Sequence, residues 1–488
     1  MNLYLIGHDY RYAAEQMLLT LFPDERPEYP DGRPTGDRAE LRLMSGTKVT
    51  TVTCVLVYHG QTANGRTSVP NGELTDPAET DRRLQGAIKR AFYRAAMGIG
   101  LPHRPWGMLT GVRPGKLMTP LLAQGLNDAQ AARQFERQYD VSPARADLVV
   151  RTAHATLRAM ESLGEKDVCL YVGIPFCPTR CAYCSFVSQS VEKSMALVPE
   201  FLQALAREIA ATAEAVRRAG LRVVSLYIGG GTPTTLSARQ LDALCTQLAA
   251  AFDLSALREF TVEAGRPDTI TADKLQVLRA HRVDRISVNP QTLSDRVLDT
   301  IGRRHTAQDI YDALRLVRET GGFAVNMDLI AGLPGDTPDG FRATLEQVLA
   351  LAPENVTVHT LSRKRGSNLM AQDAPIPDGE AVGEMLDFAG TVLPRAGYAP
   401  YYLYRQKFMS GGFENVGWTR PGQENLYNIC IMEELCSILA MGGGASTKLV
   451  RPNGGRLERH IDPKYPTEYI ANIDRICAAK AELEAFFQ

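Results

Sequence analysis

Short apolar runs alternate with helical segments between residues 168 and 359, and no other feature of the chain limits its fold as strongly. Six of these runs have the length and composition of buried strands. They span residues 168–172, 223–228, 260–263, 285–288, 324–330 and 355–359. Strands that alternate with helices at this spacing are typical of a parallel sheet built from βα units. Because a complete barrel has eight such units, the sequence predicts an α/β fold with a partial (β/α)6 TIM-like barrel.

Three cysteines follow the first predicted strand. Cys177, Cys181 and Cys184 stand at the first, fifth and eighth positions of a segment that Pro175 and Pro178 mark as a loop. Three thiolates are one too few to close a four-iron cluster, so one iron would stay open to a ligand that is not protein. Zinc is the main alternative, but the segment has one Cys-x-x-Cys unit, without the second pair or the histidine of structural zinc sites. Buried structural thiols, the other alternative, are uncommon in a loop.

Conspicuous polar or glycine residues stand at the ends of the predicted strands: Tyr171, residues 229–231, Glu263, Gln291 and Asp328. In barrels of this kind the chemistry lies at the carboxyl ends of the strands, which supports the predicted fold. The triple glycine allows close approach of the backbone to a ligand, and its alternative is a tight turn. The carboxylates could also be helix caps or turn residues.

The length of 488 residues suggests about three domains. We expect an N-terminal α+β domain of unknown role at residues 1–165, the partial barrel at residues 166–365 and a C-terminal α+β region on the substrate side at residues 366–488. In the first part, the pattern predicts strands at residues 3–7 and 48–58 and a helix at residues 80–97. The segment at residues 109–116 could cradle a phosphate or carboxylate through Arg113 and Lys116, and the alternative is a turn with two solvated charges.

Charge and hydropathy argue against some classes of function. The net charge is −1, without a basic excess that would suggest nucleic acid as a partner. The N-terminus has no pattern of a secretory signal, and no apolar run reaches the ~20 residues needed to span a bilayer. Nine cysteines in a metal-type pattern fit a reducing compartment. We therefore expect a cytoplasmic protein that works best under low oxygen.

The C-terminal region is predicted to contain a helix at residues 379–393, a strand-like aromatic and basic run at residues 401–407 and a helix at residues 425–441. The aromatic run could face a flat, carboxylated substrate or could simply pack. Cys430 and Cys436 suggest a second metal site, but on one helix they would lie about 120° apart, on different faces. The sequence therefore favours core thiols, as for Cys54, Cys169, Cys245 and Cys477.

Four segments together resemble the oxygen-independent coproporphyrinogen III oxidase family of the radical S-adenosylmethionine (SAM) superfamily. They are the cysteine loop, the triple glycine with the following Thr-Pro-Thr, residues 328–335 (Asp-Leu-Ile-Ala-Gly-Leu-Pro-Gly) and residues 404–407 (Tyr-Arg-Gln-Lys). The similarity covers about residues 166–450, and the N-terminal extension resembles the HemZ-type branch of coproporphyrinogen dehydrogenases. The resemblance implies a 4Fe-4S cluster, bound SAM and a 5′-deoxyadenosyl radical. That radical would start the oxidative decarboxylation of two propionates of coproporphyrinogen III, giving protoporphyrinogen IX in haem biosynthesis. A reducing electron donor is implied as well.

The resemblance also implies roles for individual residues. Cys177, Cys181 and Cys184 match the cluster ligands, and Tyr171 matches a tyrosine near the cluster and SAM. Positions that match cofactor contacts are Gly230, Gly231, Thr232, Glu263, Gln291, Arg303 and Asp328, and Phe186 would lie against the adenine. Arg303 and Arg304 could pair with a carboxylate, or could be solvated loop charges. A substrate with four propionates implies a basic pocket, for which the candidates are Arg363, Lys364, Arg365, Arg405 and Lys407.

Two departures from the family keep other functions open. The best-studied branch has a further cysteine where this chain has Phe186, and that difference resembles the haem-chaperone branch. The chaperone branch carries His-Asn-x-x-Tyr-Trp, however, where this chain reads Glu-Asn-Leu-Tyr-Asn-Ile at residues 424–429. The leading hypothesis is a radical enzyme acting on a porphyrinogen. The alternatives are a haem-binding carrier and a SAM enzyme acting on another substrate.

Overall fold

The computed structural model describes residues 1–184, 189–190, 195–362, 375–406, 410–451 and 457–487. The chain divides into two compact units, the first made of residues 1–112 and 121–148 and the second of residues 113–120 and 149–488. Helices α3 (Gly115–Ala123) and α5 (Pro143–Ser162) contain residues of both units. The division into domains at residues 165 and 365 stays a prediction. Among the described residues, no helix is long and apolar enough to cross a membrane.

The first unit packs helices against a four-stranded sheet of order β1-β2-β3-β4, in which only β1 and β2 are parallel. Gly65 on β4 lets α2 approach this sheet closely, because a Cβ there would lie 1.9 Å from the carbonyl oxygen of Ala91. The elements are β1 (Asn2–Ile6), α1 (Arg11–Leu21), β2 (Arg38–Ser45), β3 (Val49–Tyr58), β4 (Gln61–Pro70), α2 (Pro77–Gly98) and α4 (Asp128–Tyr139). The two strands and the helix predicted here are confirmed.

The second unit is built on one mixed sheet, with the order β13-β14-β12-β11-β10-β9-β8-β5-β15-β16-β17 among the described residues. All six predicted barrel strands are present and parallel. They are β5 (Asp167–Ile174), β8 (Arg222–Gly230), β9 (Glu259–Glu263), β10 (Arg285–Ser287), β11 (Ala324–Ala331) and β12 (Asn355–Thr360). The expected partial barrel is therefore confirmed.

Strands from the C-terminal part of the chain extend both ends of this parallel core. At one end β14 (Glu414–Thr419) runs antiparallel to β12 and pairs with β13 (Ala399–Arg405). At the other end β15 (Ser437–Gly442) runs parallel to β5. Two short antiparallel strands, β16 (Ser446–Leu449) and β17 (Glu458–Ile461), follow β15. The sheet therefore joins segments that are more than 250 residues apart in the sequence.

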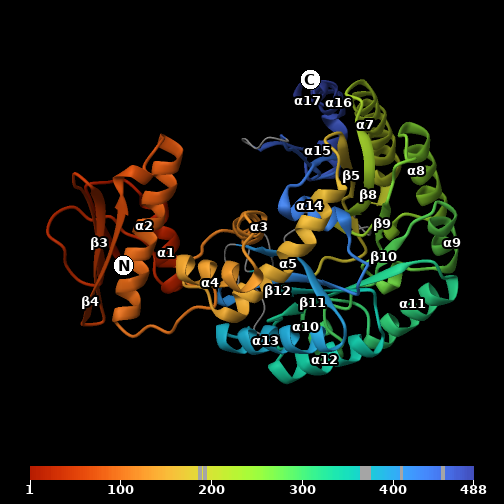
Figure 1. The fold of residues 1–488 in the computed structure, drawn as a ribbon. Coiled ribbons are helices and arrows are strands. Elements are labelled where there is room, and N and C mark those ends of the chain that lie inside the picture. Colours follow the sequence, from red (N-terminus) through yellow and green to blue (C-terminus); the bar gives the residue numbers. More distant parts are fainter. Residues whose placement is uncertain (185–188, 191–194, 363–374, 407–409, 452–456, 488) are drawn as a thin grey trace. The chain divides into compact units, whose positions relative to one another are not determined.

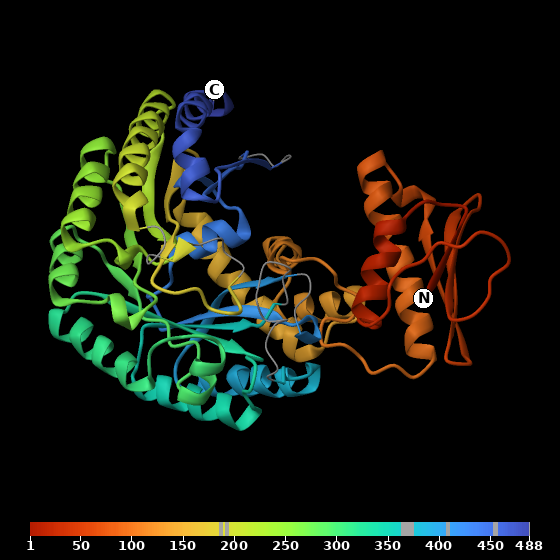
Figure 2. The ribbon, with the colours of Figure 1, turned by 180° about the vertical axis from the view of Figure 1, so that it is seen from behind.

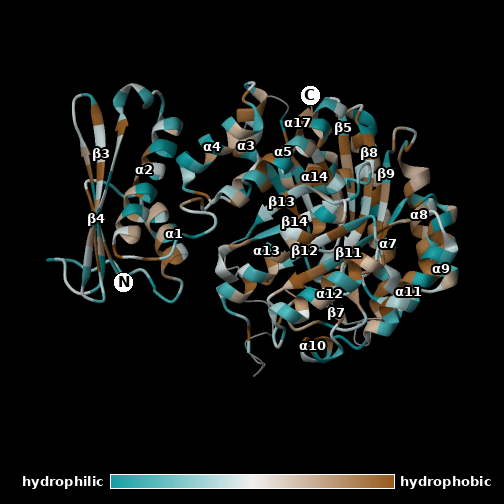
Figure 3. Cartoon of the chain, turned by 60° about the horizontal axis from the view of Figure 1, so that its bottom comes forward, coloured by the Kyte–Doolittle hydropathy of each residue, from teal (hydrophilic) through white to brown (hydrophobic). Residues whose placement is uncertain are grey.

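Helices cover the outer face of the second sheet, as Figures 1 and 2 show from opposite sides. Their exposed sides are largely hydrophilic, whereas the central strands are hydrophobic (Figure 3). This distribution follows from the amphipathic sequence patterns that predicted these helices. These helices are α7 (Val198–Arg218), α8 (Ala238–Ala251), α9 (Ala272–Ala280), α11 (Ala307–Thr320), α12 (Pro338–Ala350) and α13 (Gly379–Arg395). The short helix α10 (Asp295–Thr300) packs instead against Ala182 of the cysteine loop and Leu333 after β11. The C-terminal helices are α14 (Leu426–Glu433), α15 (Pro466–Ala471), α16 (Ile473–Ala481) and α17 (Glu484–Phe487).

The predicted helix at residues 425–441 is wrong in its second half. Helix α14 ends at Glu433, because Glu434 adopts a left-handed conformation with φ of 55° and its N–H bonds to the carbonyl oxygen of Cys430. A left-handed residue at this position is a common helix stop. The chain then reverses and enters β15 at Ser437. Cys430 and Cys436 are therefore not on two faces of one helix.

Candidate functional site

The cysteine loop begins directly after β5, and its start is fixed by packing. Phe176 is fully buried and makes an edge-to-face contact with Phe201, with ring centroids 5.3 Å apart. Further along, the N–H of Ala182 donates to the carbonyl oxygen of Ile301 at 3.0 Å, and the N–H of Cys184 donates to that of Cys181 at 3.1 Å. Cys177, Cys181 and Cys184 are all partly buried. The loop thus holds the three thiols at the carboxyl end of the parallel strands.

Donors and positive charges surround these thiols. The Thr232 hydroxyl donates to Cys177 Sγ at 3.5 Å, and Arg266 Nη1 donates to Cys181 Sγ at 3.7 Å. Burial lowers the pKa of Arg303, but Tyr183 and Cys181 outweigh it and raise that pKa above its usual value. Neighbouring cations stabilise the thiolate form that binds metal. The surroundings of Cys181 therefore suit a metal ligand and do not resemble those of an inert core thiol.

The triple glycine lies against the cysteine loop. A Cβ at Gly231 would lie 2.5 Å from the carbonyl oxygen of Phe176 and 3.0 Å from Cys177 Sγ. The N–H of Gly231 donates to the carbonyl oxygen of Ile174 at 2.8 Å, and that of Thr232 to Phe176 at 2.7 Å. Gly230 has φ of 111°, a conformation that L side chains rarely adopt. Only glycine allows this close approach, so the turn packs directly against the start of the cysteine loop.

Glu263 ends β9 and forms a hydrogen bond that the sequence did not indicate. Its Oε1 accepts from the Tyr227 hydroxyl at 2.6 Å. Burial raises the pKa of Glu263 to about 7, although the bond from Tyr227 lowers it, and the negative charge of Asp328 raises it further. A carboxyl with such a pKa can hold or release a proton near neutral pH.

Asp328 on β11 is the ionised partner of this pair. Its Oδ2 accepts from Asn289 Nδ2 and its Oδ1 from Asn326 Nδ2, both at 2.8 Å. His359 Nε2 lies 3.8 Å from Oδ2. Burial alone would raise the pKa of Asp328, but the hydrogen bonds and the charge of His359 hold it below its usual value. The two carboxyls thus differ in protonation because of their surroundings.

Gln291 and Arg303 are positioned through their contacts with the strand ends. Gln291 has φ of 65°, and its N–H donates to the carbonyl oxygen of Asp328 at 2.9 Å. Among the described residues, its buried Oε1 has no hydrogen-bond partner. Arg303 is 7% exposed and donates through Nη1 to the carbonyl oxygen of Asn289 at 2.5 Å. Arg303 is therefore not a solvated loop charge, and Gln291 offers an acceptor that a ligand could satisfy.

Tyr171 lies inside the barrel in a group of three tyrosines. Its ring centroid is 6.1 Å from that of Tyr227 and 6.0 Å from that of Tyr427, with nearly parallel planes. Tyr227 and Tyr427 are stacked at 4.4 Å. Because Tyr227 also donates to Glu263, this stack is joined directly to one of the two carboxyls. Phe186, the expected adenine contact, lies outside the described residues.

Four residues of this region were missed by the sequence reasoning: Tyr227, Arg266, Asn289 and His359. Each contacts a predicted site residue, as described above. His359 could have been found, because it stands near the end of the last predicted strand, where catalytic residues gather in such barrels. Arg266 and Asn289 follow predicted strands within a few residues, but nothing in their local sequence distinguishes them.

The residues of this site fit an iron–sulfur cluster with SAM bound to it. The cysteine loop offers three thiols with cationic neighbours, and a buried glycine turn contacts Cys177 directly. Beside them are unpartnered buried polar atoms, Gln291 Oε1 and Arg266 Nη2 among the described residues. A group with both donors and acceptors would satisfy these atoms, and SAM has both.

Two segments singled out in the sequence have other contacts. Arg113 and Lys116 both form ion pairs with Glu434, so their charges already have a partner, although the Lys116 side chain stays exposed. Arg405 is buried and donates to the carbonyl oxygen of Gly412 at 2.7 Å. Burial lowers the pKa of Arg405 to about 10, with Glu414 opposing. The other four basic candidates, Arg363, Lys364, Arg365 and Lys407, lie outside the described residues.

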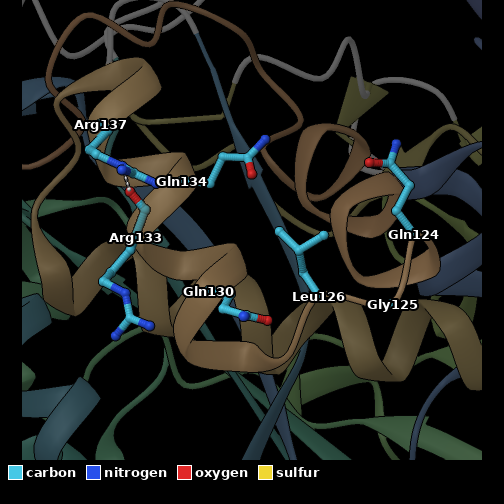
Figure 4. A pocket seen from close by; sticks show the side chains of 7 residues that line it. All are labelled: Gln124, Gly125, Leu126, Gln130, Arg133, Gln134 and Arg137. Carbon is cyan, nitrogen blue, oxygen red and sulfur yellow. Dashed lines mark hydrogen bonds between the residues drawn. The ribbon is translucent and has the colours of Figure 1, made fainter.

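The first unit has a polar cavity of about 480 Å³, which is lined by residues of α4 and of the segment just before it (Figure 4). It is lined by Gln124, Gly125, Leu126, Gln130, Arg133, Gln134 and Arg137. Arg137 Nε donates to the carbonyl oxygen of Arg133 at 3.3 Å. The lining residues are glutamine, arginine, leucine and glycine, and none of the predicted site residues is among them.

Comparisons with known proteins agree with this geometry. The Radical SAM superfamily pattern matches residues 171–348. The oxygen-independent coproporphyrinogen-III oxidase-like protein HemZ of Bacillus subtilis (strain 168) is 39% identical over 84% of this chain and 84% of its own. The heme chaperone HemW of Lactococcus lactis is 29% identical over 66% of this chain and 80% of its own. The solved structure of coproporphyrinogen III oxidase (HemN) from Escherichia coli, a radical SAM enzyme, matches 66% of this chain and 72% of its own with a TM-score of 0.50 and 25% identity.

Proposed function

Because this chain belongs to the oxygen-independent coproporphyrinogen III oxidase family of the radical SAM superfamily, we propose that it converts coproporphyrinogen III to protoporphyrinogen IX without oxygen. The observation that carries the proposal is the extent of the similarity to HemZ. The 422 matched residues exceed the second unit in number, so the similarity also includes residues of the first unit. The reaction would be the oxidative decarboxylation of two propionate side chains to vinyl groups.

The cofactors are a 4Fe-4S cluster and SAM, which together supply a 5′-deoxyadenosyl radical. That radical would take a hydrogen atom from the β-carbon of a propionate. The side chain would then lose carbon dioxide and one electron to an acceptor, and a vinyl group would remain. We assign Cys177, Cys181 and Cys184 to the three irons that have protein ligands. Arg266 donates to Cys181 Sγ, and Arg303 interacts with the same residue, so two cations lie beside this proposed ligand.

The remaining residues at the strand ends would hold SAM in position. Gly230, Gly231 and Thr232 present backbone groups beside Cys177, where the amino-acid part of SAM would approach the open iron. Asp328 stays ionised and suits a hydroxyl or ammonium donor. Glu263, with a pKa of about 7, can pair with a cationic group as a carboxylate or donate as an acid. The unpartnered Gln291 Oε1 would accept a hydrogen bond from the same ligand.

An anaerobic assay tests the function. The cluster-loaded chain is incubated with a reductant, SAM and coproporphyrinogen III, and carbon dioxide and porphyrinogen products are measured. Two molecules of carbon dioxide per divinyl product are expected. SAM cleavage without any vinyl product would contradict the proposed substrate and would favour a radical enzyme acting on another compound.

The Cys181→Ala variant tests the cluster assignment. Since three protein ligands hold the cluster, removal of one is expected to abolish SAM cleavage and to remove most of the iron and sulfide. Cys477→Ser is the matched control, because Cys477 is also partly buried but lies on α16, outside the cysteine loop. The measurements are iron and sulfide per chain and the rate of 5′-deoxyadenosine formation. Unchanged cleavage in Cys181→Ala would disprove the assignment.

The second candidate function is haem binding, since heme chaperones HemW match 66% of this chain or less at 27–32% identity. The same preparation is titrated with haem. Tight binding with a Soret band, together with no decarboxylation, would favour a carrier over the enzyme. The reverse result supports the enzyme.

A further inference from the structure

A second group of three cysteines lies away from the cysteine loop. Cys169 comes from β5, Cys430 from α14, and Cys436 from the link between α14 and β15 (Figure 1). The three Sγ atoms all lie within 4.8 Å of one another, and Cys169 and Cys436 are 3.6 Å apart. Cys169 and Cys430 are fully buried, and Cys436 is 6% exposed. Three thiols from three elements thus converge on one point.

This group is separate from the candidate active site. Cys169 is five residues before the end of β5, where the cysteine loop begins, and five strand residues span about 16 Å. The stack of Tyr171, Tyr227 and Tyr427 lies beside the group and reaches Glu263 through Tyr227. A ligand at the three thiols would therefore sit at the amino end of the strands, whereas the iron–sulfur site lies at their carboxyl end.

The surroundings of the group determine which ion it could take. Its neighbours are apolar or aromatic, including Val224 and Ile438. Among the described residues, no histidine or carboxylate joins the three sulfurs. The two nearby acids are engaged elsewhere: Asp167 pairs with Arg222 and Arg258, and Glu259 accepts from the N–H groups of Leu426 and Tyr427. The site therefore offers sulfur ligands alone, without a fourth side-chain ligand.

We propose that Cys169, Cys430 and Cys436 form a binding site for a soft monovalent cation of the Cu(I) class. Thiolates select soft ions, whereas structural zinc takes four ligands, and this buried group supplies three. An ion in the plane of three sulfurs at about 2.3 Å from each would need them about 4.0 Å apart. The observed distances between the sulfur atoms differ from this value by less than about 1 Å, so only small movements of the side chains would be needed. Each thiol that binds releases its proton.

The turn at Glu434 places Cys436 in the group. Residues 434–436 lie between the end of α14 and the start of β15, and Cys436 is the member of the group with some exposure. The left-handed residue that ends α14 is also what brings Cys436 back beside Cys430. The site thus depends on the same turn that ends the helix early.

The test is a Cu(I) titration of the full chain with its iron–sulfur cluster loaded. Copper is delivered without oxygen from a competing chelator, so that the cluster cysteines are not attacked by excess metal. Copper and iron are counted per chain, and X-ray absorption gives the number of sulfur neighbours of copper. One copper per chain with three sulfur neighbours and unchanged iron is the expected result. Iron loss matching copper uptake would overturn the proposal, because copper would then occupy the cluster loop.

Cysteine-to-serine variants test whether copper binds at this group of residues. Cys430→Ser and Cys436→Ser are expected to weaken Cu(I) binding at least 100-fold. Cys245→Ser, at a buried cysteine on α8 outside the group, should bind as the unchanged chain does within about twofold. Equal binding in all variants overturns the site. If a variant fails to fold, the number of sulfur neighbours of copper in the unchanged chain decides the question. Preferential uptake of Zn(II) with a fourth ligand overturns the Cu(I) class.

Discussion

The protonation of single residues distinguishes the two carboxyls near the proposed SAM site. Asp328 accepts hydrogen bonds from two amide side chains and lies near His359, whereas the burial of Glu263 outweighs its hydrogen bonds from Tyr227 and the backbone of Gly230. Both carboxyls stood out in the sequence, because each lies at or near the carboxyl end of a predicted strand. Their different pKa values could not be predicted, since Tyr227 and His359 come from other strands and Asn289 comes from the segment after β10.

Glu263→Gln is expected to change how stability depends on pH. The folded pKa of Glu263 is about 7, above its unfolded value, so the folded chain keeps a proton that the unfolded chain loses between about pH 4.5 and 7. Stability contributed by this group therefore falls as pH rises through that window, by up to about 3 kcal/mol. Glutamine is neutral at every pH and should remove this part of the decline in stability. The test is to measure the free energy of unfolding of the cofactor-free chain at pH 5 and at pH 8.

The control for this prediction is Glu161→Gln, at an exposed glutamate on α5. This variant should retain the full decline between pH 5 and pH 8. An identical decline in Glu263→Gln and in the unchanged chain would show that Glu263 does not hold a proton in the folded state.

Gly231→Ala tests the contact between the glycine turn and the cysteine loop. The added Cβ would overlap the carbonyl oxygen of Phe176 and press on Cys177 Sγ. We expect several-fold less iron per chain after cluster loading, with little loss of secondary structure. Gly390→Ala is the control, because a Cβ at Gly390 on α13 meets nothing within 4 Å. Equal iron in both variants would contradict the proposed packing.

At the scale of elements, strands and helices with a strong pattern were predictable and their ends were not. Helix α8 begins at a capping box formed by Ser237 and Gln240, which a sequence reader can recognise. The end of α14 carries no such signal, because Glu434 is not a residue type that usually takes the left-handed conformation. The ion pairs of Glu434 with Arg113, Lys116 and Arg459 hold it there, and they come from distant segments.

A buried ionic group fixes the C-terminal helices to α7. Lys480 on α16 pairs with Glu208 on α7 at 2.9 Å and with Asp462 at 3.4 Å. Tyr469 on α15 donates to the same Glu208, and so does the N–H of Gly442 at 2.8 Å. All these side chains are less than 9% exposed. Helices α15 and α16 therefore depend on a complete set of partners.

Lys480→Met is expected to destabilise the second unit by about 3–5 kcal/mol, because two buried carboxyls lose their cation. Denaturant unfolding of the variant measures the loss. Arg475→Met is the control, since Arg475 is exposed on the same helix, and its effect should stay within about 0.5 kcal/mol. A loss for Lys480→Met as small as that of the control would show that the ionic group contributes nothing.

At the scale of the whole molecule, the parallel core was predictable and its extension was not. The six strands are short, largely buried runs of apolar or alternating apolar and polar residues between helical segments, which is the pattern that predicted them. Strand β15 was hidden inside a predicted helix, because its sequence Ser-Ile-Leu-Ala-Met-Gly reads equally well as either element. Only the partner strand β5 decides between them, and it lies far away in the sequence. The meeting of Cys169, Cys430 and Cys436 was unpredictable for the same reason.

The pairing of β5 with β15 has a consequence for how the protein is made. One edge of β5 stays open on the ribosome until β15 has been synthesised, roughly 260 residues later. At about 5–20 residues per second, this delay lasts about 13–50 s. During that time an apolar strand edge is available to neighbouring nascent chains. Until its last parallel strand emerges, the growing sheet therefore carries an open edge of the kind that pairs with other chains.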